Sequence, residues 1–183
     1  MKKKIPDGAG GLIEIDTELP IWVEPEADNG TPMDRAFDLC GELVKPWIKE
    51  HPNDFPPIVI NITDGEPNNP EATESSAEGL RNLATKDGNV LLLNAHIADS
   101  TAQEIRLPAD EVGLPNQYAR LLYRMSSVLP KPMLDAAWNV GFAPDQYARG
   151  FVMNAGPETL TKLLIFGTDI AQSDRLQLKA QET

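Results

Sequence analysis

Two short polar sequences in this chain could bind a ligand through oxygen atoms: Asn29-Gly-Thr-Pro-Met-Asp34 and Thr63-Asp-Gly-Glu66. Asp64 follows the run Ile58–Ile62 after a single threonine, and the β-branched residues of this run between prolines and a glycine are typical of a strand covered on both faces. Ligands of open parallel sheets bind just beyond the carboxyl ends of such strands. Asp64 is therefore a candidate ligand residue, although Asp64 and Gly65 could equally form a turn or cap the next helix.

Thr31 stands where a helix is expected to begin, because apolar residues recur behind it at helical spacing. These residues are Ala36, Phe37, Leu39, Cys40, Leu43, Val44, Trp47 and Ile48. Threonine is a good N-cap and Pro32 suits a first helical turn, so capping alone would explain both residues. Pro46 is expected to kink or divide the helix, because proline lacks an amide hydrogen.

The order Gly-Thr-Pro-Met, amphipathic helix, apolar strand and Thr-Asp-Gly resembles the middle of a von Willebrand factor type A (VWA) domain. That resemblance implies a metal-ion-dependent adhesion site built from three loops, with Thr31 and Asp64 as ligands of Mg²⁺; Mn²⁺ and Ca²⁺ are alternatives. The family's remaining loop, Asp-x-Ser-x-Ser, does not occur before Thr31. The residues before Thr31 are also too few for the family's first half, since one βαβ unit alone needs about 30 residues.

Two later segments strengthen the resemblance: Arg120–Pro130 and Ala148–Ala155 look like the closing part of bacterial intracellular VWA proteins. Some members of that group are associated with stress and tellurite-resistance systems. The chain thus resembles the C-terminal part of a VWA domain from about Gly30 onward. The resemblance implies an N-terminal extension over 1–30, the VWA-like part over 31–170 and a polar tail over 171–183.

The pattern behind Asp64 keeps alternating between helices and strands. Strands are expected over Ile58–Ile62, Asn89–Ala95 and Arg149–Ala155, with helices between them and a final helix carrying Leu160 and Phe166. Strands separated by helices predict an α/β fold, a three-layer architecture with a mainly parallel sheet and helices on both faces. The stretch Ser100–Pro115 is expected to be a loop.

Composition limits the classes of partner. The formal net charge is −12 and no cluster of Lys and Arg appears, which argues against binding nucleic acid. No apolar run reaches the roughly 18 residues of a membrane span, and no signal core follows Lys2–Lys4, so a cytoplasmic location is expected. The single Cys40 excludes an internal disulfide and a thiolate zinc site.

Three functions remain open on these residues. The first is a non-enzymatic protein-binding module in which a cation at Thr31 and Asp64 accepts a carboxylate from a partner protein. The second is a magnesium-dependent hydrolase or phosphotransferase, and the third is a structural subunit without a working metal site. No catalytic constellation is identified, because His51 and His96 are far apart and Ser126 and Ser127 are expected inside a helix.

The run Ile58–Ile62 leads to one more expectation. Without the family's first strand beside it, this apolar strand would have an unpaired edge that could bind any extended chain. The edge is expected to pair with another copy of the chain, with a separate chain that supplies the N-terminal half, or with the chain's own segment Leu12–Val23.

Overall fold

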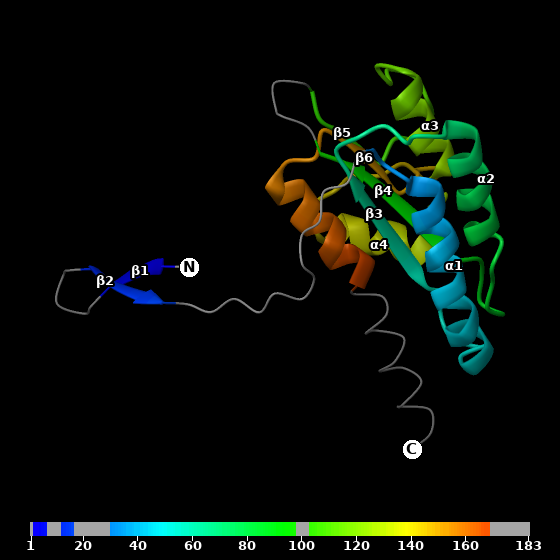
Figure 1. Cartoon of the computed structure of the whole chain (residues 1–183), viewed down its shortest axis with the longest axis horizontal. Helices are drawn as coiled ribbons and strands as arrows, with labels where there is room; N and C mark the ends of the chain where they lie inside the picture. The colour runs from blue at the N-terminus through cyan, green and yellow to red at the C-terminus, as the bar shows by residue number, and fades with distance from the viewer. Residues whose placement is uncertain (1, 7–11, 17–29, 98–102, 169–183) are drawn as a thin grey trace.

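The computed structural model describes residues 2–6, 12–16, 30–97 and 103–168. It contains a four-stranded sheet in the order β3-β4-β6-β5 and a separate two-stranded sheet formed by β1 and β2 (Figure 1). The strands are β1 Lys2–Pro6, β2 Leu12–Asp16, β3 Ile58–Thr63, β4 Leu91–His96, β5 Ile105–Arg106 and β6 Phe151–Met153. The helices are α1 Met33–Glu50, α2 Pro70–Arg81, α3 Gln117–Met125, α4 Lys131–Asn139 and a last helix over 157–168.

The larger sheet is mainly parallel, as predicted. β3 pairs with β4 and β4 with β6 in parallel, with Ile58 opposite Leu91 and Asn94 opposite Phe151. The exception is β5, which pairs antiparallel with β6 inside the segment predicted to be a loop. A two-residue strand has too little sequence to show a period of two, so the pattern could not reveal it.

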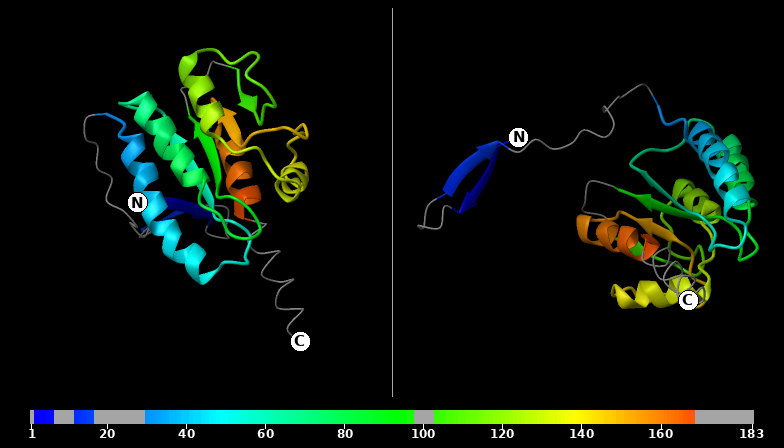
Figure 2. Two further views of the ribbon diagram at one scale, coloured as in Figure 1. Left: turned by 90° about the vertical axis from the view of Figure 1, so that its right-hand side faces the viewer. Right: turned by 90° about the horizontal axis from the view of Figure 1, so that it is seen from below.

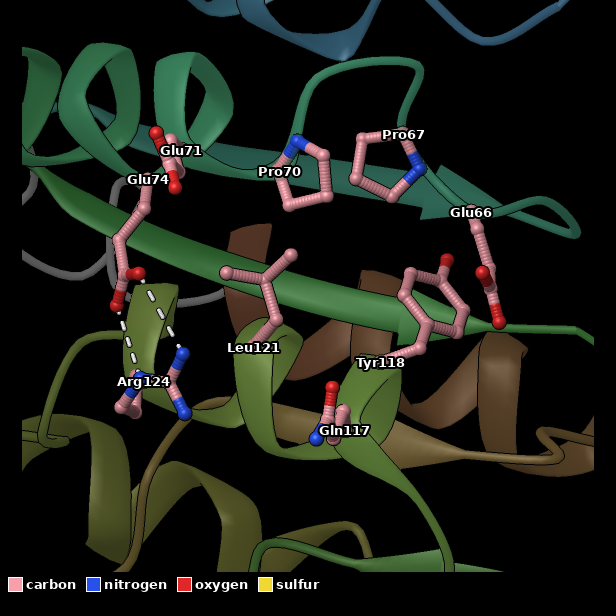
Figure 3. A pocket seen from close by; sticks show the side chains of 9 residues that line it. All are labelled: Glu66, Pro67, Pro70, Glu71, Glu74, Gln117, Tyr118, Leu121 and Arg124. Atoms are coloured by element: carbon pink, nitrogen blue, oxygen red, sulfur yellow. Dashed lines mark hydrogen bonds and ion pairs between the residues drawn. The ribbon is translucent and has the colours of Figure 1, made fainter.

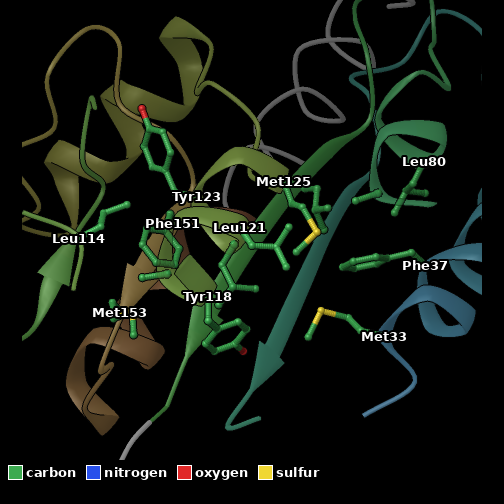
Figure 4. Packing of buried hydrophobic residues seen from close by; sticks show 14 of the residues in the cluster. Met33, Phe37, Leu80, Leu114, Tyr118, Leu121, Tyr123, Met125, Phe151 and Met153 are labelled. Atoms are coloured by element: carbon green, nitrogen blue, oxygen red, sulfur yellow. The ribbon is translucent and has the colours of Figure 1, made fainter. Parts of the chain in front are cut away.

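Helices cover both faces of this sheet, which confirms the three-layer α/β prediction. Val90 and Leu92 face a core shared with α1, α2 and α3 (Figure 4), whereas Leu91 and Leu93 face a core shared with α4 and helix 157–168. The alternation along β4 is that of a strand buried on both faces. Figure 2 shows the two helical layers on either side of the strands.

A buried polar network crosses the middle of the sheet. The side-chain amide of Asn94 donates to Ser126 Oγ at 3.0 Å, and Asn61 Nδ2 donates to Asn94 Oδ1 at 2.9 Å. Ser126 is the C-cap of α3, and Ser127 Oγ accepts the amide of Leu92 at 3.0 Å. The prediction that both serines lie inside a helix was therefore wrong: their hydroxyls join the end of α3 to β4.

Helix α1 runs without interruption through Pro46, so the expected division of the helix was wrong. Pro46 lies on the exposed side, where water can bond the carbonyl that proline leaves free. Phe37 is buried against α2 and the sheet, whereas Trp47 is only half-buried and stacks on His51 with ring centroids 4.6 Å apart.

Strand β3 is the last strand on its side of the sheet, which confirms the predicted bare edge within the described residues. The same position makes the expectation of full burial wrong, because Ile58–Asn61 are only partly buried and Ile62 is exposed. Pro20–Val23 and the tail 171–183 lie outside the described residues. None of the described helices is both long and apolar enough to cross a lipid bilayer.

Candidate functional site

The two predicted ligand loops meet at the carboxyl end of β3. A methyl group placed on Gly65 would lie 2.8 Å from Thr31 Oγ1, so the threonine hydroxyl rests directly over the glycine that follows Asp64. Only a residue without a side chain leaves room for this approach. The structure therefore brings Thr31 beside the Thr63-Asp-Gly turn, as the motif order predicted.

Capping does not explain Thr31. Helix α1 begins after Pro32, and no side chain bonds to the free amides of its first turn. Thr31 contributes its carbonyl instead, which accepts the amide of Met33 at 2.8 Å. The N-cap expectation for Thr31 was wrong, and its hydroxyl is directed to the second loop rather than to the helix.

Asn68 ties the two loops together. Its side-chain oxygen Oδ1 accepts a hydrogen bond from the backbone amide of Thr31 at 2.8 Å. Its backbone amide donates to the Thr31 carbonyl at 3.0 Å. Gly30 has a φ of 98°, and a Cβ there would lie 2.5 Å from Asn68 Oδ1, so glycine is required at that position. These bonds fix the position of Thr31 relative to the Asp64 turn.

Asp64 is exposed at the tip of this turn and caps no helix. Asn69 caps α2 by accepting the amide of Ala72 at 3.1 Å. The turn itself is held by Thr63, whose Oγ1 accepts the amide of Gly65 at 3.2 Å. Because other residues perform both local tasks, the Asp64 carboxylate remains available to a ligand.

Tyr118 of α3 supports the turn, and His96 of β4 packs against Tyr118. The Tyr118 hydroxyl donates to the carbonyl of Gly65 at 2.6 Å, and its ring meets His96 edge-on with centroids 5.6 Å apart. Burial raises the pKa of the Tyr118 hydroxyl, which keeps it protonated as the donor.

His96 ends β4 at the same rim, as the sequence predicted, but its imidazole is buried. Burial lowers the pKa of His96, although a hydrogen bond to Asn154 and the charge of Asp64 oppose the shift. The ring is therefore neutral at pH 7. Its Nδ1 has no hydrogen-bond partner among the described residues.

A groove of about 280 Å³ runs from this rim between α2 and α3 (Figure 3). Glu66 and Tyr118 stand at one end of it, and the ion pair of Glu74 with Arg124, 2.9 Å long, closes the other. Leu121 lies between them and gives the groove an apolar wall. The groove could hold an extended side chain beside the Asp64 turn.

The oxygen atoms at this rim suit a hard divalent cation. Thr31 supplies a hydroxyl and Asp64 a carboxylate, the ligand types that Mg²⁺ prefers. In the described part of the chain, no three His, Cys, Asp or Glu side chains lie close enough together to hold a metal ion by themselves. A cation here would take most of its ligands from water or from a bound partner.

Sequence reasoning found Thr31, Asp64 and His96 but missed Asn68, Tyr118 and Asn154. Asn68 sits in a loop of turn-forming residues, where one asparagine cannot be told from another, and Tyr118 looked like core. The second histidine is not part of the site: His51 is the C-cap of α1 and lies 3.2 Å from Asp54.

Comparisons of the chain with protein-family models, with curated proteins and with solved structures found no match. The resemblance to VWA domains thus stands on the motifs and their order alone.

Proposed function

We propose that this chain is a non-enzymatic protein-binding module of VWA type, with Mg²⁺ held at Thr31 and Asp64 and completed by a carboxylate of the partner protein. One observation is the main support. The Thr31 hydroxyl and the Asp64 turn are held together by Asn68, while neither side chain is needed to cap a helix. Mn²⁺ and Ca²⁺ are the alternative cations. The proposal includes a cytoplasmic location and no binding to membranes or nucleic acid.

Two protein ligands hold Mg²⁺ weakly, because this ion demands near-octahedral oxygen coordination. We expect a dissociation constant of about 1 mM or weaker for the chain alone. A partner carboxylate would add a charged ligand, and so binding of the cation and of the partner would strengthen each other. The groove between α2 and α3 lies next to that position and could seat the neighbouring residues of the partner.

Mn²⁺ binding to the isolated chain, followed by electron paramagnetic resonance, tests the cation site. Asp64→Asn should weaken binding by at least about tenfold, since it removes the charged ligand. Asp87→Asn is the matched control, because Asp87 is an exposed aspartate just before β4, at the opposite end of the strands. Equal Mn²⁺ affinity in wild type and Asp64→Asn would exclude this site.

A short peptide with one central glutamate, beside the same peptide with glutamine, tests the role of the partner carboxylate. The glutamate peptide should raise Mn²⁺ affinity in wild type and not in Asp64→Asn, and Mg²⁺ should compete. An identical effect of both peptides would contradict carboxylate ligation. Binding of neither peptide nor Mn²⁺ would leave the structural-subunit function.

One observation, the state of His96, supports the alternative of a magnesium-dependent hydrolase. His96 is neutral at pH 7 and lies close enough to Asp64 to feel its charge, as a general base beside a metal-bound substrate would. Burial of the ring argues against it, because a base must reach the proton that it removes. Magnesium-dependent hydrolysis of p-nitrophenyl phosphate that is lost in His96→Gln would favour the enzyme over the binding module.

A further inference from the structure

The outer edge of β3 is a row of free backbone groups without a charged neighbour in the strand. The carbonyls of Pro57 and Thr63 accept the amides of Leu91 and Ile97, so the odd-numbered residues bond to β4. The amide and carbonyl groups of Ile58, Ile60 and Ile62 consequently point away from the sheet. No described residue pairs with them.

Helix α1 presents an unused apolar face above this edge. Its groove with α2 is lined on the α1 side by Phe37, Asp38, Gly41, Glu42 and Lys45. Apolar residues lie on the opposite side of the helix at spacings of three and four: Ala36, Leu39, Cys40, Leu43 and Trp47. Leu39 is 61% exposed and Leu43 is 68% exposed. Helix α1 itself adjoins β3, since Asn61 Nδ2 of the strand lies 3.5 Å from Met33 Sδ.

Helix 157–168 provides a second wall on the other face of the sheet. Gly167 approaches β3 closely, since a Cβ there would lie 3.0 Å from Ile60 Cδ1. Leu160 and Leu164 share the stripe of Gly167, and Leu164 is 41% exposed, like Ile62 of β3. Partly exposed apolar residues of α1 and of helix 157–168 therefore lie on the two faces of the sheet near the free edge of β3, and we call this region the slot.

The handedness of the crossover connections limits which segment can supply a further strand beside β3. The connection from β3 through α2 to β4 is parallel, and α1 lies on the same face of the sheet as α2. Parallel crossovers are right-handed in about 98% of cases. A parallel strand that precedes α1 in the sequence can satisfy this rule only beyond the free edge of β3, because on the other side its crossover would be left-handed.

We propose that β2 of the same chain fills this slot, parallel to β3, and extends the sheet to the order β1-β2-β3-β4-β6-β5. β2 precedes α1, spans five residues beside the six of β3, and has one edge left free by β1. The intervening residues 17–32 can reach roughly 50 Å at about 3.3 Å each, more than twice the length of β3. The inference stands independently of the cation site.

Two physical properties favour this occupant over a second copy of the chain. A two-stranded hairpin is marginal in water by itself, so β1 and β2 need a surface to pack against. Once β2 is docked, the outer strand would be β1, which contains Lys2, Lys3, Lys4 and Pro6. Lysine and proline are the residues with which proteins protect exposed edges, and β3 has neither.

Amide hydrogen exchange of the full-length chain, with its mass measured by light scattering, tests the docking. Docked β2 should protect the amides of Ile58, Ile60 and Ile62 by at least about 100-fold in a monomer. Ile13→Asp in β2 should lower that protection at least about tenfold, because a charge would enter the apolar slot. The amides of Val59 and Asn61, bonded to β4, should stay protected and show that the variant is folded.

Cys40 offers a second readout, since it is the single cysteine and lies on the apolar face of α1. Its reaction with a thiol reagent should be slow in wild type and at least about tenfold faster in Ile13→Asp. Val112→Asp is the matched control, because Val112 is 85% exposed in a loop away from the slot. It should change neither exchange nor reactivity.

Three results would overturn the proposal. Free exchange of the Ile58, Ile60 and Ile62 amides in a wild-type monomer would show an empty slot. Protection that Ile13→Asp leaves unchanged would assign the slot to another segment. A dimer whose protection disappears on dilution would assign it to a second copy of the chain.

Discussion

The two edge strands of the main sheet, β3 and β5, differ in length and in charge. At one edge, β5 has only two residues, and Arg106 and Glu104 place an ion pair beside it. At the other edge, β3 has six residues, none of them charged, and three outward-facing isoleucine amides. Short length and charge are the usual means by which proteins prevent edge-to-edge association, so β5 is protected and β3 is open.

The open edge also adjoins the candidate site. β3 delivers Asp64 to the rim, and α1 begins there behind Thr31, so the strand, the helix above it and the ligand loops form one unit. On the β5 side, Asn154 bonds to the Gln103 carbonyl and reaches the His96 ring at the rim, but within the described residues neither Thr31 nor the Asp64 turn lies there. The candidate site therefore lies at the end of the sheet edge that no described strand covers.

The largest expected effect comes from detaching α1 from the open edge. Phe37→Ala should lower the free energy of unfolding by about 3 to 5 kcal/mol, because Phe37 is buried in the core that holds α1 on α2 and the sheet. Urea denaturation measures the loss. Val112→Ala, in an exposed loop, should stay within about 0.5 kcal/mol, and a similar loss in both variants would mean that α1 is not anchored by Phe37.

A smaller effect is expected where the ligand loops meet. Gly65→Ala should cost about 1 to 3 kcal/mol, because its methyl group would overlap Thr31 Oγ1. Thr31→Ala removes that oxygen, so the double variant should regain at least about 0.5 kcal/mol over the sum of the single effects. Denaturation of the four proteins completes the cycle, and simple additivity would contradict the contact.

Adding a charge at the β3 edge and removing one from the β5 edge should change the rate of aggregation more than the free energy of unfolding. Ile62→Lys places a charge beside the β3 edge, and Arg106→Ile removes a charge from the β5 edge. Each substitution should change the free energy of unfolding by less than about 1 kcal/mol. Mild heating should detach the marginal hairpin of β1 and β2 and expose the β3 edge, so light scattering should then show slower aggregation of Ile62→Lys and faster aggregation of Arg106→Ile. The opposite order would mean that β5 is the adhesive edge.

The smallest effect is expected at the ion pair between Glu74 of α2 and Arg124 of α3, away from the open edge. The hydrogen bond from Arg124 lowers the pKa of Glu74 below its ordinary value of 4.5. The stabilisation is thus fully present above about pH 4.5 and is lost as pH falls through the lowered folded pKa. Both side chains are well exposed, so Glu74→Gln should cost less than about 0.5 kcal/mol at pH 7 and nothing at pH 2.

Urea denaturation at both pH values measures this difference, with Glu71→Gln on the same helix as the charge-matched control. A Glu74→Gln effect that persists at pH 2 would show that packing, and not the ion pair, stabilises the α2–α3 contact.

Sequence patterns predicted most of the fold because its elements are strongly periodic. The stripe of α1, the buried run of β4 and the apolar face of α3 each identify their element. β5 was missed because two residues carry no period. Pro46 was expected to kink or divide α1, and the helix is not divided because an exposed position tolerates the missing hydrogen bond.

Part of the candidate site could be predicted in the same way. Thr31 and Asp64 could be found because their motifs stand at the ends of clear elements, and His96 because it ends a strand. Asn68 acts through Thr31, which lies 37 positions away in the sequence, and Tyr118 acts through Gly65, which lies 53 positions away. No local sequence pattern contains such contacts.

The sequence alone determined which segments become helices and strands, because side-chain periodicity is a local property that burial then exploits. Only the tertiary structure decided that Asn68 holds Thr31, that Tyr118 holds the Gly65 carbonyl, and that β5 pairs antiparallel with β6. Those outcomes depend on the order in which strands pair and on the face to which each helix packs. Both are set by contacts between distant residues and by the handedness of the connections.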